Sequence, residues 1–279
     1  MRDNPRSARV RERARLRQKD ARSETGLFLL EGPQAIREAV SFRPELVTEA
    51  YVSEDAWVKH TDLVTALGDA GIPWELATDK VIDALADTRT PQGMVAVCRQ
   101  FPVSLRALLG PEATSGLRLI AVLEDVRDPG NMGTIIRAAD AAGADAVILT
   151  GRSVDLYNPK VVRSTTGSLF HLPIAVGAQL DEVTSLARGR GMQVLAADVA
   201  GEELTFTSGR LLAAATAWVF GNEAHGLSPE ALACADRALR LPIFGSAESL
   251  NVATAASVLL YQSAFMQHAE LPGRDTDLG

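Results

Sequence analysis

Cysteine is almost absent from this sequence, which has only Cys98 and Cys234 in 279 residues. Two cysteines cannot build a disulfide framework, and they lack the clustered spacing of a structural zinc site. No apolar run approaches the roughly 18 residues of a membrane-spanning helix, and the arginine-rich N-terminus lacks the apolar stretch of a secretory signal. These absences argue against a secreted, membrane-embedded or zinc-stabilised protein. We therefore expect a cytoplasmic protein that needs no metal and contacts no membrane.

A further absence concerns nucleotide cofactors. The G-x-G-x-x-G fingerprint of dinucleotide-binding folds occurs nowhere in the chain. This counts against an NAD enzyme, against other nucleotide-dependent α/β enzymes and against the commonest kind of methyltransferase. What is present is a chain with 47% apolar residues, which together with its length is ordinary for a soluble protein of two domains.

The net charge of −7 is unevenly distributed along the chain. Residues 1–22 hold nine basic and three acidic side chains, a charge of +6, so the remainder of the chain carries −13. A basic arm on an acidic body fits binding to the phosphate backbone of a nucleic acid, because each neutralised phosphate releases counterions. The alternative is a solvated N-terminal leader without a partner.

Composition and periodicity divide the chain into a basic arm (1–22), a small α/β domain (23–100), a linker (101–117) and a larger α/β domain (118–279). The linker is rich in Gly, Pro, Ser and Thr and has no sustained periodicity. In the larger domain, helices separate apolar runs of strand length, at 119–123, 146–149, 172–176, 193–197, 217–220 and 238–243. This pattern predicts a parallel sheet covered on both faces, in which ligands bind at the carboxyl ends of the strands.

The first loop of interest follows the strand at 119–123 and leads into a helix expected at 131–142. Asn131 stands where it can cap that helix, and Gly133 and Arg137 share one helix face. An arginine on an otherwise apolar helix is costly unless its guanidinium finds a carboxylate or a phosphate. Arg137 is therefore a candidate substrate contact, or else a member of a structural ion pair.

The second loop follows the strand at 217–220. Gly221 allows a ligand to approach the backbone closely, Glu223 stands at the mouth of the loop, and Gly226 permits a tight return. His225 is a candidate general base near neutral pH, although a histidine in a loop is more often a surface residue.

The third loop follows the strand at 238–243 and precedes a helix expected at 249–267. Ser246 or Ser249 is expected to cap this helix. Asn251 is a polar residue at the start of the expected helix, and the residues that follow it are mostly apolar. This makes Asn251 a candidate site residue. The alternative is that Ser and Asn are here only as good helix-start residues.

Together, the order and spacing of three segments resemble the motifs of the SpoU/TrmH family of RNA ribose 2′-O-methyltransferases. The segments are Asn131-x-Gly133-x-x-x-Arg137, then Phe220-Gly221-Asn222-Glu223-x-x-Gly226-Leu227, and then Leu241-Pro242 followed by Ser249-Leu250-Asn251-Val252. The stretch 163–173 also resembles the family. The similarity is specific over about residues 119–267 and looser over 27–99.

The resemblance implies a C-terminal methyltransferase domain whose parallel sheet contains a trefoil knot. It also implies S-adenosylmethionine as the cofactor, bound in a bent form by the knot loops, and a homodimer whose active sites lie near the subunit interface. Residues 23–100 resemble the ribosomal-protein-like RNA-binding domain that many family members place before the catalytic domain.

Position within the motifs gives the candidate site residues. The catalytic candidates are Asn131, Arg137, Glu223, Ser249 and Asn251. The cofactor-binding candidates are Gly221, Leu241, Ile243 and Leu250, with Thr150 and Gly151 after the preceding strand. In the family, the arginine matching Arg137 is proposed to activate the ribose 2′-hydroxyl. Because arginine is very hard to deprotonate, two roles stay open: a base helped by a nearby phosphate, or a fork that holds phosphate and hydroxyl.

The resulting prediction is S-adenosylmethionine-dependent 2′-O-methylation of a ribose in structured RNA. The RNA-binding-like domain favours ribosomal RNA as the substrate. The alternatives are a transfer RNA ribose methyltransferase and a non-catalytic RNA-binding protein of the same fold.

Overall fold

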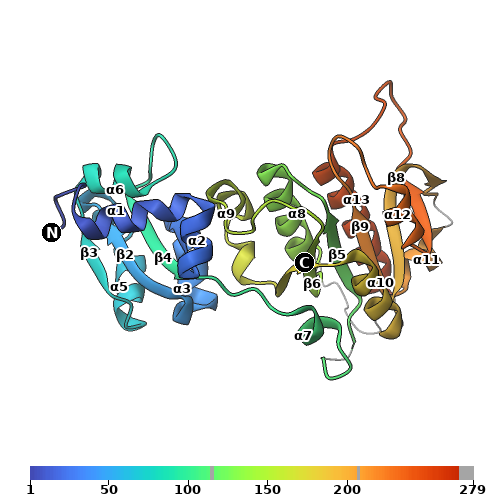
Figure 1. Ribbon diagram of the computed structural model, residues 1–279, viewed down its shortest axis with the longest axis horizontal. Helices are drawn as coiled ribbons and strands as arrows, with labels where there is room; N and C mark the ends of the chain where they lie inside the picture. The colour runs from blue at the N-terminus through green and yellow to red at the C-terminus, as the bar shows by residue number, and fades with distance from the viewer. Residues whose placement is uncertain (114–115, 206–207, 270–279) are drawn as a thin grey trace, which may run out of the picture. The chain divides into compact units, whose positions relative to one another are not determined.

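Two compact units make up the part of the chain that this computed structural model describes, residues 1–113, 116–205 and 208–269 (Figure 1). Unit 1 contains Met1–Phe101 and Asp155–His171, and unit 2 contains Pro102–Val154 and the chain from Leu172 onward. The chain therefore passes from one unit to the other three times.

Unit 1 is built on a four-stranded sheet with the strand order β1-β4-β2-β3. Its elements are α1 (Ala8–Ala14), η1 (Arg15–Arg17), α2 (Lys19–Thr25), β1 (Leu27–Glu31), α3 (Pro33–Phe42), η2 (Pro44–Leu46), β2 (Val47–Val52), α4 (Glu54–Lys59), α5 (Thr61–Asp69), β3 (Trp74–Leu76), α6 (Asp79–Leu85), β4 (Met94–Arg99), α9 (Pro159–Thr165) and η3 (Ser168–Phe170). β4 pairs antiparallel with β1 and β2, and β3 pairs parallel with β2. Val10, Leu16 and Leu85 share a core with Leu29 and Val97, so α1, η1 and α6 cover one face of this sheet.

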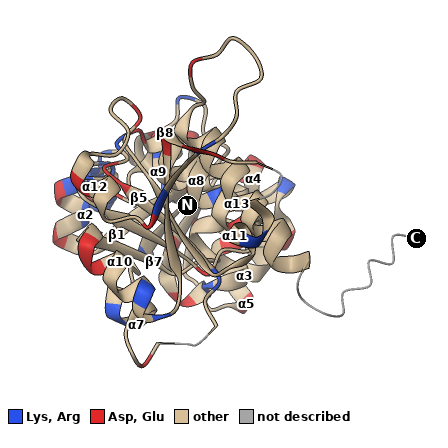
Figure 2. Ribbon diagram, turned by 90° about the vertical axis from the view of Figure 1, so that its right-hand side faces the viewer, with Lys and Arg blue, Asp and Glu red and all other residues tan. Residues whose placement is uncertain are grey.

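The first 22 residues are a folded part of unit 1 and not a solvated leader. Arg9 and Arg13 both pair with the buried Glu49, and Arg22, only 2% exposed, pairs with Asp155. Basic and acidic residues also alternate along α2, and Figure 2 shows residues of both signs on the helices. Carboxylates of unit 1 thus neutralise much of the arm's charge of +6, which a count over the sequence cannot reveal.

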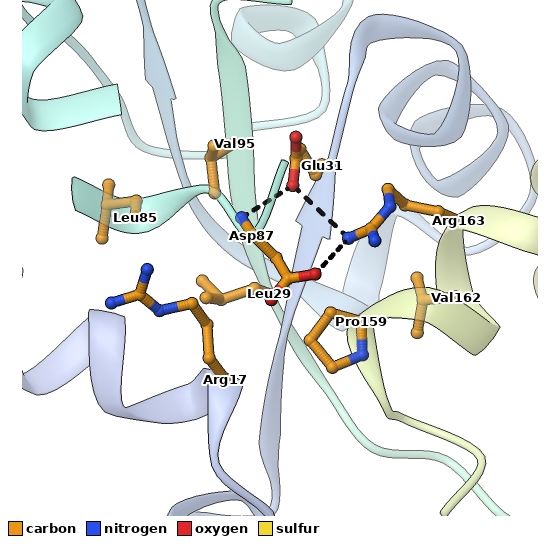
Figure 3. Close-up of a pocket in the computed structure, with 9 residues that line it drawn as sticks. All are labelled: Arg17, Leu29, Glu31, Leu85, Asp87, Val95, Pro159, Val162 and Arg163. Carbon is orange, nitrogen blue, oxygen red and sulfur yellow. Dashed lines mark hydrogen bonds and ion pairs between the residues drawn. The ribbon is translucent and has the colours of Figure 1, made fainter. Parts of the chain in front are cut away.

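Residues 155–171 follow β6 (Ala146–Thr150) in the chain but fold with unit 1, whereas the sequence pattern predicts them in a domain that begins at 118. Arg163 on α9 brings Nη1 to 2.8 Å from Asp87 and 3.8 Å from Glu31 (Figure 3). Glu31 also accepts a hydrogen bond from the main-chain N–H of Asp87. Periodicity predicts the helix at α9 but says nothing of the sheet on which it packs.

Unit 2 is built on a six-stranded sheet with the order β10-β8-β9-β5-β6-β7, in which every adjacent pair is parallel. Its elements are α7 (Leu105–Leu109), β5 (Leu119–Glu124), α8 (Pro129–Ala141), β6 (Ala146–Thr150), β7 (Ile174–Ala178), α10 (Leu180–Gly189), β8 (Gln193–Glu203), α11 (Gly209–Ala213), β9 (Thr216–Phe220), α12 (Pro229–Ala233), β10 (Arg237–Arg240) and α13 (Val252–Ala269). The predicted parallel sheet is therefore confirmed. The predicted linker, in contrast, contains α7, whose Leu109 is buried in the core of unit 2.

Helices cover both faces of this sheet. Leu109, Val183 and Ala231 share a core with Ile120 and Val219, which places α7, α10 and α12 on one face. On the other face α13 packs against α8, β5 and β9, and the indole N–H of Trp218 donates to Ser263 Oγ on α13 over 2.9 Å. None of the helices described in residues 1–113, 116–205 and 208–269 is long and apolar enough to cross a membrane.

The strand order brings three loops to one edge of the sheet. β5 lies between β6 and β9, and Leu123 of β5 stands opposite Leu149 of β6 and Phe220 of β9. Because the strands are parallel, the loops that follow them begin side by side.

Candidate active site

The loop between β5 and α8 is shaped by a cap one turn earlier than expected. Asp128, and not Asn131, is the N-cap of α8, and its Oδ1 accepts a hydrogen bond from the N–H of Asn131 over 2.8 Å. Pro129 follows at the first helical position, where its fixed φ suits the helix and its missing N–H is not needed. The Asp-Pro pair is the sequence signal that identifies this cap. Asn131 is left inside the first turn with its side chain available to other loops.

The loop after β9 closes on itself through Asn222. The main chains of Asn222 and Gly226 exchange hydrogen bonds of 3.1 and 2.9 Å, and Asn222 Oδ1 accepts a hydrogen bond from the N–H of Ala224. A Cβ on Gly221 would lie 2.6 Å from the carbonyl carbon of Gly226. Gly221 therefore serves the closure of its own loop, because the space that its missing side chain leaves is filled by that loop.

Two side chains of the β9 loop hold the β5–α8 loop. Glu223 accepts hydrogen bonds from the N–H of Arg127 over 3.3 Å and from the N–H of Asp128 over 3.0 Å. Asn222 Nδ2 donates to the carbonyl of Asp125 over 2.8 Å. The carboxylate of Glu223 thus sits at the start of α8, where the helix dipole favours a negative charge.

The third loop joins the first through two asparagines. Asn251 Oδ1 accepts hydrogen bonds from the N–H groups of Ala253 and Thr254, so Asn251 caps α13 in place of the expected Ser246 or Ser249. The amide of Asn251 also donates to Asn131 Oδ1 over 3.0 Å. The structure therefore brings together Asn131, Glu223 and Asn251, whose loops are far apart in the sequence.

The remaining catalytic candidates lie in solvent-accessible positions. Arg137 is exposed on α8, one turn after the buried Gly133, and its side chain makes no hydrogen bond or ion pair to any residue that the structure describes. A structural ion pair of Arg137 within the described chain is thus excluded. Ser249 is exposed in the loop before α13. His225 is also exposed, and its main-chain N–H donates to Asn222 Oδ1.

The loop after β6 meets the same edge of the sheet. Thr150 is fully buried, and its hydroxyl donates to the carbonyl of Leu123, so it acts within the sheet. Gly151 has a φ of 59°, and a Cβ there would lie 2.6 Å from Asp125 Oδ1. Beside it, Glu124 Oε2 is buried without a hydrogen-bond partner in the described chain. Such an orphaned acceptor is rare in folded proteins and points to a missing donor.

The apolar cofactor candidates lie on the segment that joins β10 to α13, which extends away from the sheet (Figure 1). Leu241 is half-buried, whereas Ile243 and Leu250 keep 38% and 41% of their surface exposed, and the neighbouring Phe244 keeps 95%. Ile243, Phe244 and Leu250 thus expose apolar surface on the segment that leads to Asn251. The described residues contain no cluster of His, Cys, Asp or Glu suited to a metal ion.

Each of the two units contains a segment that matches a known protein family. Residues 118–261 match the SpoU rRNA Methylase family, and residues 29–103 match the family described as RNA 2′-O ribose methyltransferase substrate binding. The 23S rRNA (guanosine(2553)-2′-O)-methyltransferase RlmP of Bacillus subtilis is 32% identical, with coverage of 93% of this chain and 97% of the relative. The 23S rRNA (uridine(2479)-2′-O)-methyltransferase of Streptomyces viridochromogenes is 31% identical, with coverage of 92% and 90%.

Solved structures show the same fold. The AdoMet-bound rRNA methyltransferase from Sinorhizobium meliloti is 29% identical with a TM-score of 0.79, covering 96% of this chain and 97% of that one. The SpoU methyltransferase AviRb from Streptomyces viridochromogenes, in complex with the cofactor AdoMet, is 28% identical with a TM-score of 0.80, covering 94% and 100%.

Proposed function

The chain belongs to the SpoU rRNA methylase family, and from that premise we propose that it methylates the 2′-hydroxyl of a ribose in 23S ribosomal RNA, with S-adenosylmethionine as the methyl donor. Two relatives that cover more than 90% of the chain are named as 23S rRNA 2′-O-methyltransferases. Their names favour ribosomal RNA over transfer RNA as the substrate.

The observation that carries the proposal is the convergence of the three motif loops. Glu223 and Asn222 tie the β9 loop to the β5–α8 loop, and Asn251 ties the start of α13 to Asn131. A reaction between two bound molecules gains much of its rate from fixed positions, and such a hydrogen-bonded frame supplies them. A protein that only bound RNA would have no need of this frame together with the guanidinium of Arg137, which is unpaired in the described chain.

The segments that follow the strands of unit 2 contain residues that fit S-adenosylmethionine. The orphaned Oε2 of Glu124 suits a cationic or N–H-bearing ligand, and the exposed side chains of Ile243 and Leu250 suit an adenine ring. When bound, the cofactor supplies an activated methyl group on a sulfonium. We assign Leu241, Ile243 and Leu250 to its apolar part, and Gly151 and Gly221 to the turns that shape the site.

Arg137 is the group that we assign to the reacting ribose. Its guanidinium is unpaired in the described chain, so all of its donors are available to a phosphate and to the 2′-oxygen. Because arginine keeps its proton at neutral pH, we favour the positioning role over the role of a base. Asn131 and Asn251 would orient the sugar, with the hydroxyl of Ser249 as a further contact, and Glu223 would hold the loop in place.

The assembly that the family resemblance implies is also part of this proposal. Val258, Tyr261 and Phe265 expose apolar surface along α13, at a spacing that places them on one side of the helix. This stripe supports a homodimer. A trefoil knot formed by the segment between β10 and α13, and a cytoplasmic location beside the ribosome, complete the proposal.

Unit 1 would bind the RNA substrate. The support is the match of residues 29–103 to a family described as substrate binding. We propose that residues 155–171 belong functionally to this unit, because Arg163 and Asp155 pair with its residues Asp87 and Arg22.

The test is methyl transfer to defined RNAs. The protein is incubated with labelled S-adenosylmethionine and, in parallel, with deproteinised 23S rRNA, assembled large subunits and transfer RNA. We expect label in the ribosomal RNA, at a ribose that becomes resistant to alkaline cleavage. Label in transfer RNA alone would replace the substrate assignment, and cofactor binding without transfer to any RNA would favour a non-catalytic RNA-binding protein.

A variant tests the role of Arg137. Arg137→Ala should lower the rate of transfer at least about a hundredfold, because charge-assisted contacts in the transition state would be lost. S-adenosylhomocysteine binding, measured by calorimetry, should be unchanged. A variant that kept most of its rate would show that Arg137 does not take part in the reaction.

A further inference from the structure

Asp125 has an unusual backbone conformation at the edge of the candidate site. Its φ is 55°, and among the described residues only Thr166 is another non-glycine with a positive φ. For most residues with a side chain this conformation costs on the order of 1 kcal/mol or more, and Asp and Asn tolerate it best. Asn222 stabilises it by donating from Nδ2 to the carbonyl of Asp125 over 2.8 Å. Strain of this kind persists where the surroundings impose it, and it is often found at functional sites.

The carboxylate of Asp125 holds two further groups. Oδ1 accepts a hydrogen bond from the N–H of Arg152 in the loop after β6, and Oδ2 lies 3.3 Å from Nη2 of Arg127. The side chains of Arg127 and Asp125 are 57% and 33% exposed. An ion pair this exposed contributes little to stability, at most about 1 kcal/mol. The pair therefore does not explain why the backbone is held in a costly conformation.

What the arrangement achieves is to fix the position of Arg127. Its main-chain N–H donates to Glu223 Oε2 over 3.3 Å, and its guanidinium is held by Asp125, so both ends of the residue are restrained. A guanidinium has five N–H donors in a planar fork. Within residues 1–113, 116–205 and 208–269, Asp125 is the one side chain to which the guanidinium of Arg127 donates, and the remaining guanidinium donors are free.

We propose that Arg127 is a phosphate-binding residue of unit 2 that contacts the RNA backbone next to the target ribose, and that Asp125 and Asn222 position it. The inference rests on the proposed function and extends it to a site that the motifs do not include. Beyond the arm the chain carries a charge of −13, which repels RNA, so a fixed cation at the active-site edge is needed to hold a phosphodiester there. The fork of an arginine matches two phosphate oxygens.

The first experiment measures binding and not catalysis. The affinity of the full-length protein for deproteinised 23S rRNA is measured between about 50 and 200 mM salt. Over this range the slope of log affinity against log salt reports how many phosphates the protein neutralises. Arg127→Ala should bind about tenfold more weakly at the low-salt end, and its slope of log affinity against log salt should be smaller by nearly one. Arg127→Lys should restore the slope but only part of the affinity, because it keeps the charge without the fork.

The matched control is Arg188→Ala. Arg188 is an exposed arginine of unit 2 that pairs with Asp236 at 2.8 Å, away from the motif loops in the chain. The Arg188→Ala variant should leave both the affinity for RNA and the slope of log affinity against log salt unchanged. If Arg188→Ala caused the same loss as Arg127→Ala, the effect would be one of general charge, and the phosphate site would be rejected. An Arg127→Ala variant with the affinity and slope of the wild type would also overturn it.

A second pair of variants tests the positioning role of Asp125. Asp125→Gly relieves the backbone strain but removes the carboxylate that accepts from the N–H of Arg152, so the melting temperature should change by no more than about a few degrees while RNA affinity falls about as in Arg127→Ala. Asp125→Asn tolerates the same backbone and keeps an oxygen acceptor, so it should retain most of the affinity. Equal RNA affinity of Asp125→Gly and wild type would reject the positioning role. Failure of the wild type to methylate any RNA would overturn the proposed function and leave these binding results to stand alone.

Discussion

Asn251 donates a hydrogen bond from its amide to Oδ1 of Asn131 over 3.0 Å, across 120 positions of the sequence. The same Asn251 uses its own oxygen to cap α13, so both polar atoms of its side chain are engaged. Asn131 can accept this bond because Asp128, and not Asn131, caps α8. Two helix starts are thereby fixed relative to each other by one pair of amides.

We expect the two asparagines to act as a unit in catalysis. Asn131→Ala and Asn251→Ala should each lower the rate of methyl transfer about tenfold, because each leaves its partner without the hydrogen bond. The double variant should lose less than the sum of the two, with a coupling energy of about 1 kcal/mol in a double-mutant cycle on kcat. Strictly additive losses would mean that the bond does not contribute to the reaction.

Loss of the two hydrogen bonds that Glu223 accepts should loosen the start of α8. Glu223→Ala leaves the N–H groups of Arg127 and Asp128 without an acceptor, and we expect a loss of activity of about tenfold or more. Glu223→Gln keeps one oxygen and should retain more activity than Glu223→Ala. If the two variants lost activity equally, the negative charge would matter more than the hydrogen bonds, since neither variant keeps the charge.

Gly151→Ala should be destabilising and should disturb Asp125. A methyl group there would lie 2.6 Å from Asp125 Oδ1, at a backbone φ of 59° that side chains disfavour. We expect a loss of about 1–3 kcal/mol in the free energy of unfolding, measured by urea denaturation. Gly177→Ala is the control, because Gly177 has a similar φ of 71° but no atom within 4 Å of the added group. A similar loss in both variants would assign the effect to φ and not to the contact.

The arm of residues 1–22 should contribute to the stability of unit 1. Arg22→Ala removes the ion-pair partner of Asp155. It also removes the donors to the carbonyls of Leu16 and Arg17, at a position where the arginine is only 2% exposed. Breaking a buried ion pair costs about 3–5 kcal/mol, so we expect unit 1 to unfold at markedly lower urea. A variant with wild-type stability and weaker RNA binding would instead make the arm an RNA contact.

Glu49 should make unit 1 sensitive to acid. Burial raises the pKa of its carboxyl, but hydrogen bonds from Arg9, Arg13 and Tyr51 outweigh burial and hold the pKa below the usual 4.5. Because the pKa is lower in the folded state, the resulting stabilisation is present above pH 4.5 and is lost as the pH falls through the folded-state pKa.

The measurement for Glu49 is the difference in unfolding free energy between wild type and Glu49→Gln. We expect this difference to be constant at neutral pH and to shrink steadily as the pH is lowered below 4.5. A difference that did not change with pH would mean that packing at this position, and not the ionised carboxylate, provides the stability.

Much of the fold was predictable, because patterns within short stretches of the sequence indicate where its strands and helices lie. Apolar runs of strand length, separated by helices, predict the parallel sheet, and its order then places the loops after β5, β6 and β9 side by side. The cap of α8 was also open to prediction, since Asp128 precedes a proline. The expected end of one strand at 243 was wrong, because β10 ends at Arg240 and, of the apolar residues that follow, Ile243 and Phe244 are exposed.

Other features of the site had no local signal. Asn222 and Asp125 look like ordinary polar loop residues in the sequence, and their pairing depends on the distance between two loops. Residues 155–171 read as one more helix of the larger domain, yet they pack on unit 1 through Arg163 and Asp155. The basic arm likewise reads as free charge, because its carboxylate partner Glu49 lies far along the chain.

The order of amino acids by itself determined which residues form the motif loops, where the strands and helices recur, and that an arginine stands on an apolar helix. These follow from interactions within a few residues of each other, which leave a period or a spacing in the chain. Only the tertiary structure decided that Asn131 meets Asn251, that Glu223 holds the N–H groups before α8, and that Arg137 is left unpaired in the described chain. Those contacts depend on which strands become neighbours, and neighbouring strands are chosen by the packing of the whole sheet.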